Sequence, residues 1–470
     1  MAVAVPGALL ATLGVVWTVY EIGVYRHPVG GWGAPLGIDL YVDGLAAAFL
    51  ALLAVVAGLA SLHVLADPDV KAMPRRRQSL FWSLWYWVWG ALAAMFVSGD
   101  AFNIYVTLEL ATLAGVILVS FGHGAVALFA SLRYLLIGTL GALSYVLGVA
   151  LLYGATGTLD LVLLGERLVP GPAVVVAAAL VTVGLAIKAA LVPLHIWLPP
   201  AHGSAPAGVS AILSALVVKA GFYLLVRYWL GPFVSLGDGV ATALGILGAV
   251  GVLWGSLNAI RQERLKLLVA YSTVAQVGYL FLLFPLAAAG GHVMAWSGAH
   301  LLVLSHATAK AAAFLAAGNI LTSQGTDHLS EIGRASHHHR LSLLAFGLAG
   351  ATLMGLPPSG GFLAKWLMVT AAVETGQWWW AAVLIIGGKL AAIYVYRVVR
   401  LGFVTSPMEP PGAAGPPRPP GLLPVPMLTI LAALGLAVVS VGLGFASAPP
   451  LRLLQIGMPA APGIALEPLP

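Results

Sequence analysis

The sequence predicts a polytopic α-helical membrane protein, and its composition and apolar patterning support this fold class. Hydrophobic residues make up 60% of the 470 residues and charged residues only 8%, whereas a soluble domain carries roughly 25% charged residues. The apolar runs are continuous and about twenty residues long, the length at which a helix crosses a bilayer. They lack the polar alternation of barrel strands. These features exclude a soluble enzyme, a disordered chain and a β-barrel.

Thirteen apolar segments are long enough to span a membrane. The first has no basic region before it, so we interpret it as a helix and not as a cleaved signal. The two longest segments, near 292–321 and 341–374, are expected to bend or tilt. The thirteen segments lie near 4–21, 41–64, 79–98, 102–122, 130–153, 172–197, 204–230, 239–260, 265–287, 292–321, 341–374, 378–404 and 421–446.

The loop charges predict the orientation of this bundle. If the N-terminus faces the cytoplasm, the connections on the same side carry twelve basic residues and the opposite side carries four, which follows the positive-inside bias. We therefore expect a multi-pass protein of the cell inner (plasma) membrane. The twelve are Lys71, Arg75, Arg76, Arg77, Arg261, Arg264, Lys266, Arg334, Arg340, Arg397, Arg400 and Arg418, and the four are Arg26, Arg167, Arg227 and Arg452.

Several chemistries are excluded by residues that the sequence lacks. The chain has no cysteine, so disulfides, iron–sulfur clusters and thiolate metal sites are ruled out. No Walker A motif is present, which excludes ATP as the direct energy source. The net charge of +6 is accounted for by the basic loops and does not predict nucleic-acid binding. We expect no bound cofactor and no metal.

Seven charged residues remain within the apolar segments: Glu109, Arg133, Lys188, Lys219, Lys310, Lys365 and Lys389. Each charge in mid-membrane costs roughly 2.5–3.5 kcal/mol on insertion scales. One carboxylate cannot pair with several ammonium groups, so some lysines are expected to be hydrated or neutral. A lysine that alternates between charged and neutral forms is a proton carrier. Snorkelling to the membrane surface is the alternative, and we favour it for Arg133 and Lys389.

Two apolar segments are interrupted by prolines close to a lysine. Pro193 follows Lys188 by five residues, and Pro357 and Pro358 precede Lys365. Proline frees a carbonyl one turn back, and in a bilayer that group must face protein or water. Paired interrupted spans are typical of a transport pathway at the membrane midplane. A packing kink is the alternative.

Histidines add titratable groups beside these lysines. His306 and Lys310 are spaced i, i+4, so they share a helix face, and His195 is expected on nearly the same face as Lys188. Histidine relays protons near neutral pH; a hydrogen-bonded core residue is the alternative for each. Three other stretches are interpreted as connections: a turn at 154–160, a solvated loop with His337–His339, and a proline-rich spacer at 407–421.

These residues occur within motifs that resemble a known family. The motifs are GDAFNIYVTLE, SLRYLLIGTLGA, GATGTLDL, IKAALVPLHIWLPPAHGSAPAGVSAILSALVVKAGFYLLVR, RLKLLVAYSTVAQVGYLF, HATAKAAAFLAAG and GLPPSGGFLAKWL. The chain, roughly from residue 36 to 404, resembles the antiporter-like membrane subunits of Mrp-type cation/proton antiporters, respiratory complex I and membrane-bound hydrogenases. The first motif is most similar to the D subunit of Mrp antiporters.

The resemblance implies an organisation and a set of site residues. It implies N-terminal helices at 1–78, two inverted five-helix repeats at 79–230 and 238–404 with one broken helix each, a linker at 405–420 and a last helix at 421–446. It implies a switchable ion pair of Glu109 with Lys188. Further functional positions carried over from the family are Lys219, His306, Lys310 and Lys365.

The chain also departs from the family pattern. Family members usually have fourteen helices, and from the thirteen apolar segments we expect this chain to lack the first. Pro200 stands where the family commonly has an aspartate, and His300 lies six residues before His306, where a related histidine is usually nearer. The first departure leaves open which subunit of such a complex the chain is.

Three functions remain open at this point. The first is a proton-translocating subunit of a multisubunit cation (Na⁺)/proton antiporter, with other membrane subunits as partners. The second is the same machinery in a complex I-like or hydrogenase-linked pump, where this chain would carry no redox site of its own. The third is a stand-alone solute carrier, which would need a polar substrate pocket that the sequence does not indicate.

Overall fold

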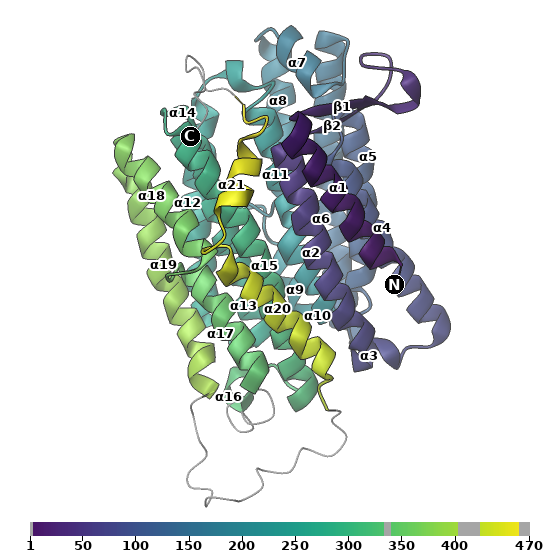
Figure 1. Ribbon diagram of the computed structural model, residues 1–470, viewed down its shortest axis with the longest axis vertical. Coiled ribbons are helices and arrows are strands. Elements are labelled where there is room, and N and C mark those ends of the chain that lie inside the picture. The colour runs from purple at the N-terminus through teal and green to yellow at the C-terminus, as the bar shows by residue number, and fades with distance from the viewer. Residues whose placement is uncertain (1–2, 333–339, 403–423, 460–470) are drawn as a thin grey trace, which may run out of the picture.

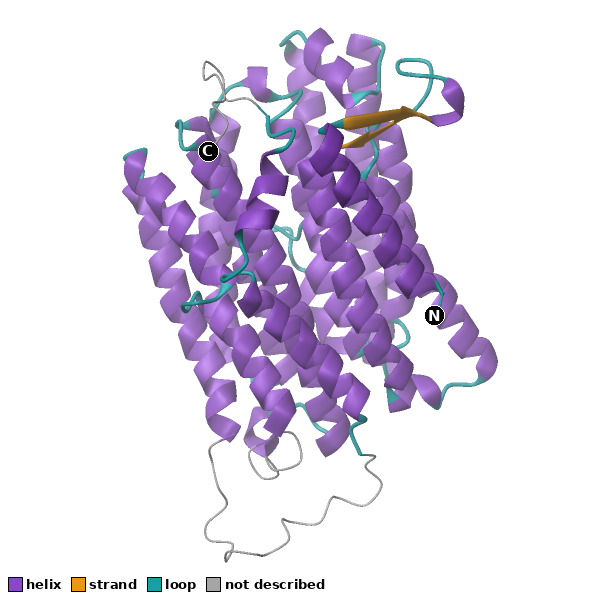
Figure 2. Cartoon of the chain, in the orientation of Figure 1, coloured by secondary structure: helices purple, strands orange, loops and turns teal. Residues whose placement is uncertain are grey.

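The computed structural model describes residues 3–332, 340–402 and 424–459 (Figure 1). Long helices run side by side along the length of the molecule, and almost all remaining residues are in loops (Figure 2). This arrangement satisfies backbone amides within each helix, as a bilayer requires. The two strands and α7 lie at one end of the bundle, which we call the hairpin end. Helices α3 and α16 lie at the opposite end, the α3 end.

The first half of the chain supplies the strands and eleven of the helices. Prolines or glycines end or interrupt several of them. They are α1 (Ala4–Ile22), β1 (Tyr25–Pro28), β2 (Asp39–Val42), α2 (Gly44–Ala66), α3 (Pro68–Lys71), α4 (Arg75–Phe96), α5 (Ala101–Val119), α6 (Gly124–Thr156), α7 (Leu161–Arg167), α8 (Pro172–Lys188), α9 (Leu198–Ser204), α10 (Ala207–Ile212) and α11 (Val218–Trp229). A π-helical turn, Leu213–Val217, joins the last two helices.

In the second half of the described chain, all regular secondary structure is helical. Its helices are α12 (Gly239–Arg261), α13 (Leu265–Leu280), α14 (Leu283–Ala288), α15 (His292–Gln324), α16 (Leu329–Ile332), α17 (Arg340–Met354), α18 (Gly360–Glu374), α19 (Trp378–Val399), α20 (Met427–Gly442) and α21 (Ala448–Gln455). Short 3₁₀ turns cover Val29–Gly31, Val234–Leu236 and Arg400–Gly402.

The helical membrane fold class is confirmed. Among the described residues, ten helical stretches are long and apolar enough to cross a bilayer, and three shorter apolar helices, α8, α17 and α20, fall in further expected segments. The count of thirteen spans, the repeat boundaries and the cytoplasmic N-terminus stay predictions. The linker at 405–420 and the His337–His339 loop lie outside the described residues, whereas most of the expected last span appears as α20.

Short polar side chains start several helices at the bundle ends. The carboxylate of Asp43 accepts the Ala46 amide at 2.9 Å at the start of α2. Asp100 accepts the Asn103 amide at 2.7 Å at the start of α5. These caps satisfy amide donors that have no partner within the helix. They fix where each helix begins, and so the depth of every side chain along it.

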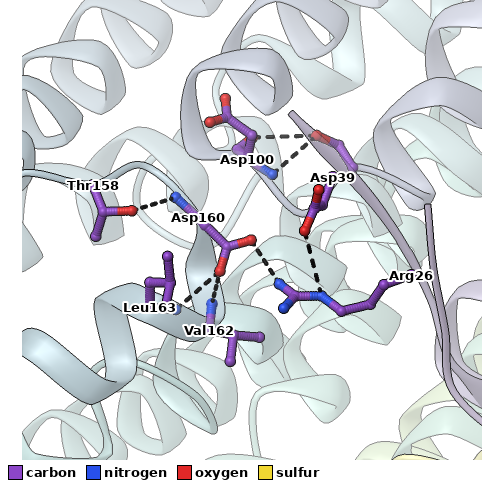
Figure 3. Close-up of polar contacts among 8 residues, drawn as sticks. Arg26, Asp39, Asp100, Thr158, Asp160, Val162 and Leu163 are labelled. Carbon is purple, nitrogen blue, oxygen red and sulfur yellow. Dashed lines mark hydrogen bonds and ion pairs between the residues drawn. The ribbon is translucent and has the colours of Figure 1, made fainter. Parts of the chain in front are cut away.

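The hairpin β1–β2 was not predicted, because its four-residue strands leave no clear periodicity in the sequence. Its strands pair antiparallel. Figure 3 shows how Arg26 of β1 joins the hairpin to the loop before α7, with its Nη2 2.7 Å from Asp160 Oδ2. Backbone bridges also link Leu40 with Ser98 and Asp100 with Asp160. The loops after α4 and α6 are therefore fastened to the hairpin.

Helix α15 forms the centre of the bundle. It is buried along its length and packs against α10, α13, α17, α18 and α20. Small residues allow the close approach: a Cβ on Gly298 would lie 2.9 Å from the carbonyl oxygen of Ala364 in α18. Close packing over small residues is the usual way in which membrane helices associate. Residues that α15 carries therefore lie deep in the protein.

Both predicted interruptions are present as breaks in a helix. The first falls between α8 and α9, over residues 189–197, and the second between α17 and α18, over residues 355–359. A 33-residue helix comes earlier in the chain than each broken helix: α6 before α8, and α15 before α17. One turn prediction needs correction: 154–160 is not all loop, because α6 continues to Thr156 before Gly157 ends it in the left-handed region.

Candidate functional site

Lys188 and Glu109 form an ion pair at the first break. Lys188 is the last residue of α8, and its Nζ lies 3.0 Å from Glu109 Oε2 of α5 and 2.8 Å from Thr112 Oγ1. Lys188 is buried, and the Glu109 side chain is 18% exposed. The ammonium group is thus held by one carboxylate and one hydroxyl, both from α5.

Lys219 lies just after the π-helical turn that separates α10 from α11. Its side chain is fully buried, and its Nζ donates to the carbonyl of Ser214 within that turn. A π turn shifts the regular hydrogen-bond pattern, which leaves a carbonyl free to accept from a side chain. Ser214 also contacts Thr273 of α13, at 2.9 Å between hydroxyl oxygens. This contact brings Lys219 next to the second half of the bundle.

Lys310 lies in the middle of α15 and is fully buried. Its Nζ donates to the Val269 carbonyl at 3.1 Å and to the Ser272 hydroxyl, both on α13. Neither partner carries a charge. The structure therefore places this lysine in the core with neutral oxygen acceptors.

Lys365 belongs to α18 but its partners belong to α17. Its Nζ donates to the Leu353 carbonyl at 2.8 Å and to the Met354 carbonyl at 3.4 Å, at the very end of α17. The same atom lies 4.6 Å from the ring centre of Tyr279, a cation–π distance. The second break thus supplies the acceptors for its lysine, as the freed carbonyls of an interrupted membrane helix do.

His306 lies one turn before Lys310 on α15, as the i, i+4 spacing predicts. It is buried, and neither ring nitrogen has a hydrogen-bond partner among the described residues. The charges of Lys219, Lys310 and Lys365 all act on it. A titratable ring without a fixed partner can accept or donate a proton to water or to a neighbouring lysine.

The arrangement has one carboxylate for four buried lysines. Within residues 3–332, 340–402 and 424–459, no carboxylate lies within 4.0 Å of Lys219, Lys310 or Lys365. A buried charge without a counter-ion is costly, so these groups are suited to losing and regaining a proton. The same part of the chain holds no cluster of three or more His, Asp or Glu suited to a metal. The chemistry that this site supports is proton transfer.

Comparison with known sequences decides the family. Residues 98–391, more than half of the chain, match the family described as "NADH:quinone oxidoreductase/Mrp antiporter, TM". The chain belongs to this family.

Individual members of the family are similar over most of the chain. The N subunit of NADH-quinone oxidoreductase from Desulforudis audaxviator is 39% identical, over 89% of this chain and 84% of that protein. The D subunit of a Na⁺/H⁺ antiporter from Alkalihalophilus pseudofirmus is 29% identical, over 85% and 80%. A chain in the structure of the Mrp complex from Dietzia sp. DQ12-45-1b has a TM-score of 0.86 at 25% identity, covering 98% of this chain and 92% of that chain. The predicted family and the multi-pass membrane fold are confirmed.

One histidine in this antiporter-like subunit was missed from the sequence. His202 of α9 is fully buried, its ring packs edge-on against Phe314 of α15, and both ring nitrogens lack a hydrogen-bond partner among the described residues. The charges of Lys219, Lys266 and Lys310 act on it. Its position just after Pro199 and Pro200, in the second part of the broken helix, is the signal that could have identified it.

Three placements predicted from the sequence are wrong. Lys266 is not a solvated loop base: it is 4% exposed and donates to the Ala205 carbonyl. Arg227 does not lie free in a loop, because its guanidinium forms a bidentate pair with buried Asp43, at 2.5 and 2.6 Å. His195 does not share a helix face with Lys188, because α8 ends at Lys188. His195 instead accepts from the indole N–H of Trp254 at 3.2 Å.

Arg133 and Lys389 differ from the buried lysines. Arg133 is exposed on α6 and Lys389 is exposed on α19. Both therefore lie on the outer surface of the bundle, where snorkelling is open to them. We leave them outside the candidate site.

Proposed function

We propose that this antiporter-like chain carries protons across the membrane as one subunit of a multisubunit cation/proton antiporter, with Na⁺ as the candidate exchanged cation. The observation that carries the proposal is the set of four buried lysines with a single carboxylate partner. The likeness to the Mrp complex chain and to the D subunit of Na⁺/H⁺ antiporters supports the antiporter form. The partners would be other membrane subunits of the complex.

The proposed transport begins at the ion pair. Glu109 keeps Lys188 protonated, since the paired carboxylate stabilises the ammonium form. A positive charge arriving from a neighbouring subunit would attract Glu109 and release Lys188. Lys188 would then give up its proton more readily. The ion pair is therefore the switch in this proposal, and its distance of 3.0 Å describes the closed position.

The proton then moves along the remaining titratable groups. Lys219 accepts it through internal water, and His306 and Lys310 pass it along α15. Lys365 releases it beyond the second break. Every step moves one proton between a lysine or histidine nitrogen and water, so no redox cofactor takes part. Carbonyl oxygens at the π turn and at the end of α17 hold Lys219 and Lys365 in place.

A second form of the function has its own support. The 39% identity to an N subunit of NADH-quinone oxidoreductase favours a proton-pumping subunit of a complex I-like or hydrogenase-linked assembly. The same residues would carry the protons, and electron transfer in other subunits would drive them. The partner subunits distinguish the two forms: small multi-span antiporter subunits in the first, iron–sulfur or nickel–iron subunits in the second.

Replacing either member of the ion pair tests the proposal. We expect Glu109→Gln and Lys188→Ala to reduce proton transport by the reconstituted complex at least about tenfold, which corresponds to about 1.4 kcal/mol in the barrier. Lys389→Ala is the matched control, because it removes an exposed lysine from another apolar helix and should transport normally. Assembly of each complex is checked by gel filtration. Normal transport by both ion-pair variants would contradict the proposal.

A further inference from the structure

A cavity of about 500 Å³, lined in part by charged residues, opens at the α3 end of the bundle. Its walls come from α3, the start of α4, the loop between α5 and α6, the break between α9 and α10, the start of α13 and the end of α15. Three of the helices that contribute to these walls, α9, α13 and α15, also carry residues of the buried interior. The charged and titratable residues that line it are Asp67, Asp69, Arg77, His123, Arg264 and Lys266.

The inner wall of the cavity separates it from the buried lysines. Lys266 forms part of this wall, and its ammonium group donates to the carbonyl of Ala205, the residue that ends α9. Gly203 and Ser204 also line the cavity, so His202 lies directly behind the wall. The charge of Lys266 acts on His202, and so do those of Lys219 and Lys310. The end of α9 therefore contributes both to the cavity wall and, through His202, to the buried interior.

Asp67 is the carboxyl in this cavity that lacks an ion-pair partner in the described chain. Asp69 lies 3.7 Å from His123, and Arg264 is paired with Asp327 at 2.9 Å. Arg77 lies over the ring of Phe121. Asp67 itself is only 8% exposed and accepts the backbone amide of Asp69 at 3.0 Å, which caps α3.

The surroundings of Asp67 suit a group that gains and loses protons near neutral pH. Burial raises its pKa to about 6, and the nearby charge of Asp69 acts in the same direction. The hydrogen bonds from the backbone of Asp69 and Val70 and the charge of Lys266 oppose this shift without cancelling it. His63, one turn earlier on α2, bonds to Asn319 at 3.1 Å and not to Asp67.

We propose that this cavity is the proton uptake vestibule of the chain, with Asp67 as the residue that takes protons from water and Lys266 as the gate to the interior. The proposal rests on the proposed proton transport. A proton leaves a water molecule or hydronium ion and binds an Asp67 carboxylate oxygen. When Lys266 is neutral it accepts that proton, and when its ammonium group leaves the Ala205 carbonyl it can reach towards His202. No bond other than O–H and N–H changes.

Neutralising Asp67 tests this role. Asn still caps α3, since asparagine is as good a capping residue as aspartate, so Asp67→Asn removes only the titration. We expect proton uptake from the α3 side to fall several-fold. In the native complex the rate should rise as the pH on that side falls through about 6, because protonated Asp67 becomes more populated, and then level off. The variant should lose this dependence, and Asp67→Glu should restore it.

Asp69→Asn is the matched control, because Asp69 lines the same cavity but is paired with His123 and largely exposed. We expect its rate at low pH to match that of the native complex and its pH dependence to persist, shifted to lower pH because the charge of Asp69 no longer raises the pKa of Asp67. If the Asp67→Asn variant has the native rate and pH profile, the proposal that this cavity takes up protons through Asp67 is wrong. If Glu109→Gln abolishes transport while Asp67→Asn does not, only the vestibule fails; if neither affects transport, the proposed function fails with it.

Chemical labelling tests the cavity without measuring transport. The chain has no cysteine, so a single introduced cysteine is the only thiol. Ser204→Cys should react with a membrane-impermeant maleimide from the α3 side. Ser235→Cys, exposed beyond α11 at the hairpin end, should react only from the opposite side, and Ser256→Cys, 1% exposed on α12, should stay unlabelled. A Ser204→Cys protein that labels no faster than Ser256→Cys would show that water does not reach the inner wall.

Discussion

Backbone carbonyl oxygens hold most of the buried lysines in this chain. Lys219 and Lys365 donate to carbonyls at a π turn and at a helix end. The sequence could show that lysines lie in apolar segments, because charge is visible residue by residue. It could not show their acceptors, since every residue carries a carbonyl and only the break decides which one is free. Lys266 was misplaced for the same reason: its acceptor, Ala205, looks like any other alanine.

At the scale of residues, the pair of Arg227 and Asp43 shows a second limit of prediction from the sequence. The two lie 184 positions apart, and each is close to the end of an apolar segment, where a charge is expected to be solvated. Only the folded bundle brings them together. Their contact joins α11 to the start of α2, beside the fastened hairpin.

Breaking this pair should destabilise the protein. Asp43→Asn keeps the cap of α2 but leaves the guanidinium without its counter-ion. The loss should be about 3 kcal/mol, the low end for a buried pair, because the Arg227 side chain is 13% exposed. Thermal unfolding in detergent measures it. Arg26→Gln is the control: Arg26 is 37% exposed, so the change should cost no more than about 1 kcal/mol. Equal melting temperatures for the two variants would contradict this expectation.

At the scale of elements, prolines and glycines identified the breaks but not their geometry. Pro193 and the Pro357–Pro358 pair predicted two interrupted helices, and both are present. The π turn before Lys219 and the interruption between α13 and α14 carry no proline at their centre, so periodicity alone did not reveal them. The hairpin was missed because its strands are too short to alternate visibly. Local signals find a break, whereas packing decides what the freed groups contact.

Gly361 makes the second break possible. A Cβ at this position would lie 2.0 Å from the carbonyl oxygen of Thr352 in α17. We expect Gly361→Ala to push the start of α18 away from the end of α17, to destabilise the bundle by roughly 1–3 kcal/mol and to impair transport through Lys365. Melting temperature and transport rate are the measurements. Gly442→Ala, where a Cβ would meet nothing within 4 Å, should behave as the native chain does; equal behaviour of both variants would refute the expectation.

At the scale of the whole molecule, the sequence predicted the helical bundle and its family, because composition and motifs are properties of the entire chain. The centre of the bundle was harder to predict. Helix α15 is buried on every side, so its sequence shows no polar face from which a direction could be derived. One feature of the structure is in keeping with the two predicted repeats: in each of them, a 33-residue helix precedes the broken helix. Their inverted relation stays a prediction.

The partners of the native protein follow from the choice between the two proposed forms. We expect a mild-detergent pull-down from native membranes, analysed by mass spectrometry, to recover small multi-span antiporter subunits at stoichiometric yield. Transport should then respond to added Na⁺. Recovery of iron–sulfur or nickel–iron subunits would favour the redox-driven form instead. Recovery of this chain alone would count against both forms and favour a stand-alone carrier. A pull-down from cells expressing an unrelated tagged membrane protein is the control.

The acceptors at the helix breaks have a practical consequence for anyone mapping this pathway by mutagenesis. An alanine scan replaces side chains, yet the Leu353 and Met354 oxygens that hold Lys365 belong to the main chain and survive every such replacement. An alanine scan therefore tests the lysine in these contacts but not the carbonyl oxygens that accept from it. Inserting or deleting one residue in α17 would instead rotate those oxygens by about 100° and remove them from the lysine. Changes in chain register, and not in residue identity, are the mutations to which this part of the pathway is most sensitive.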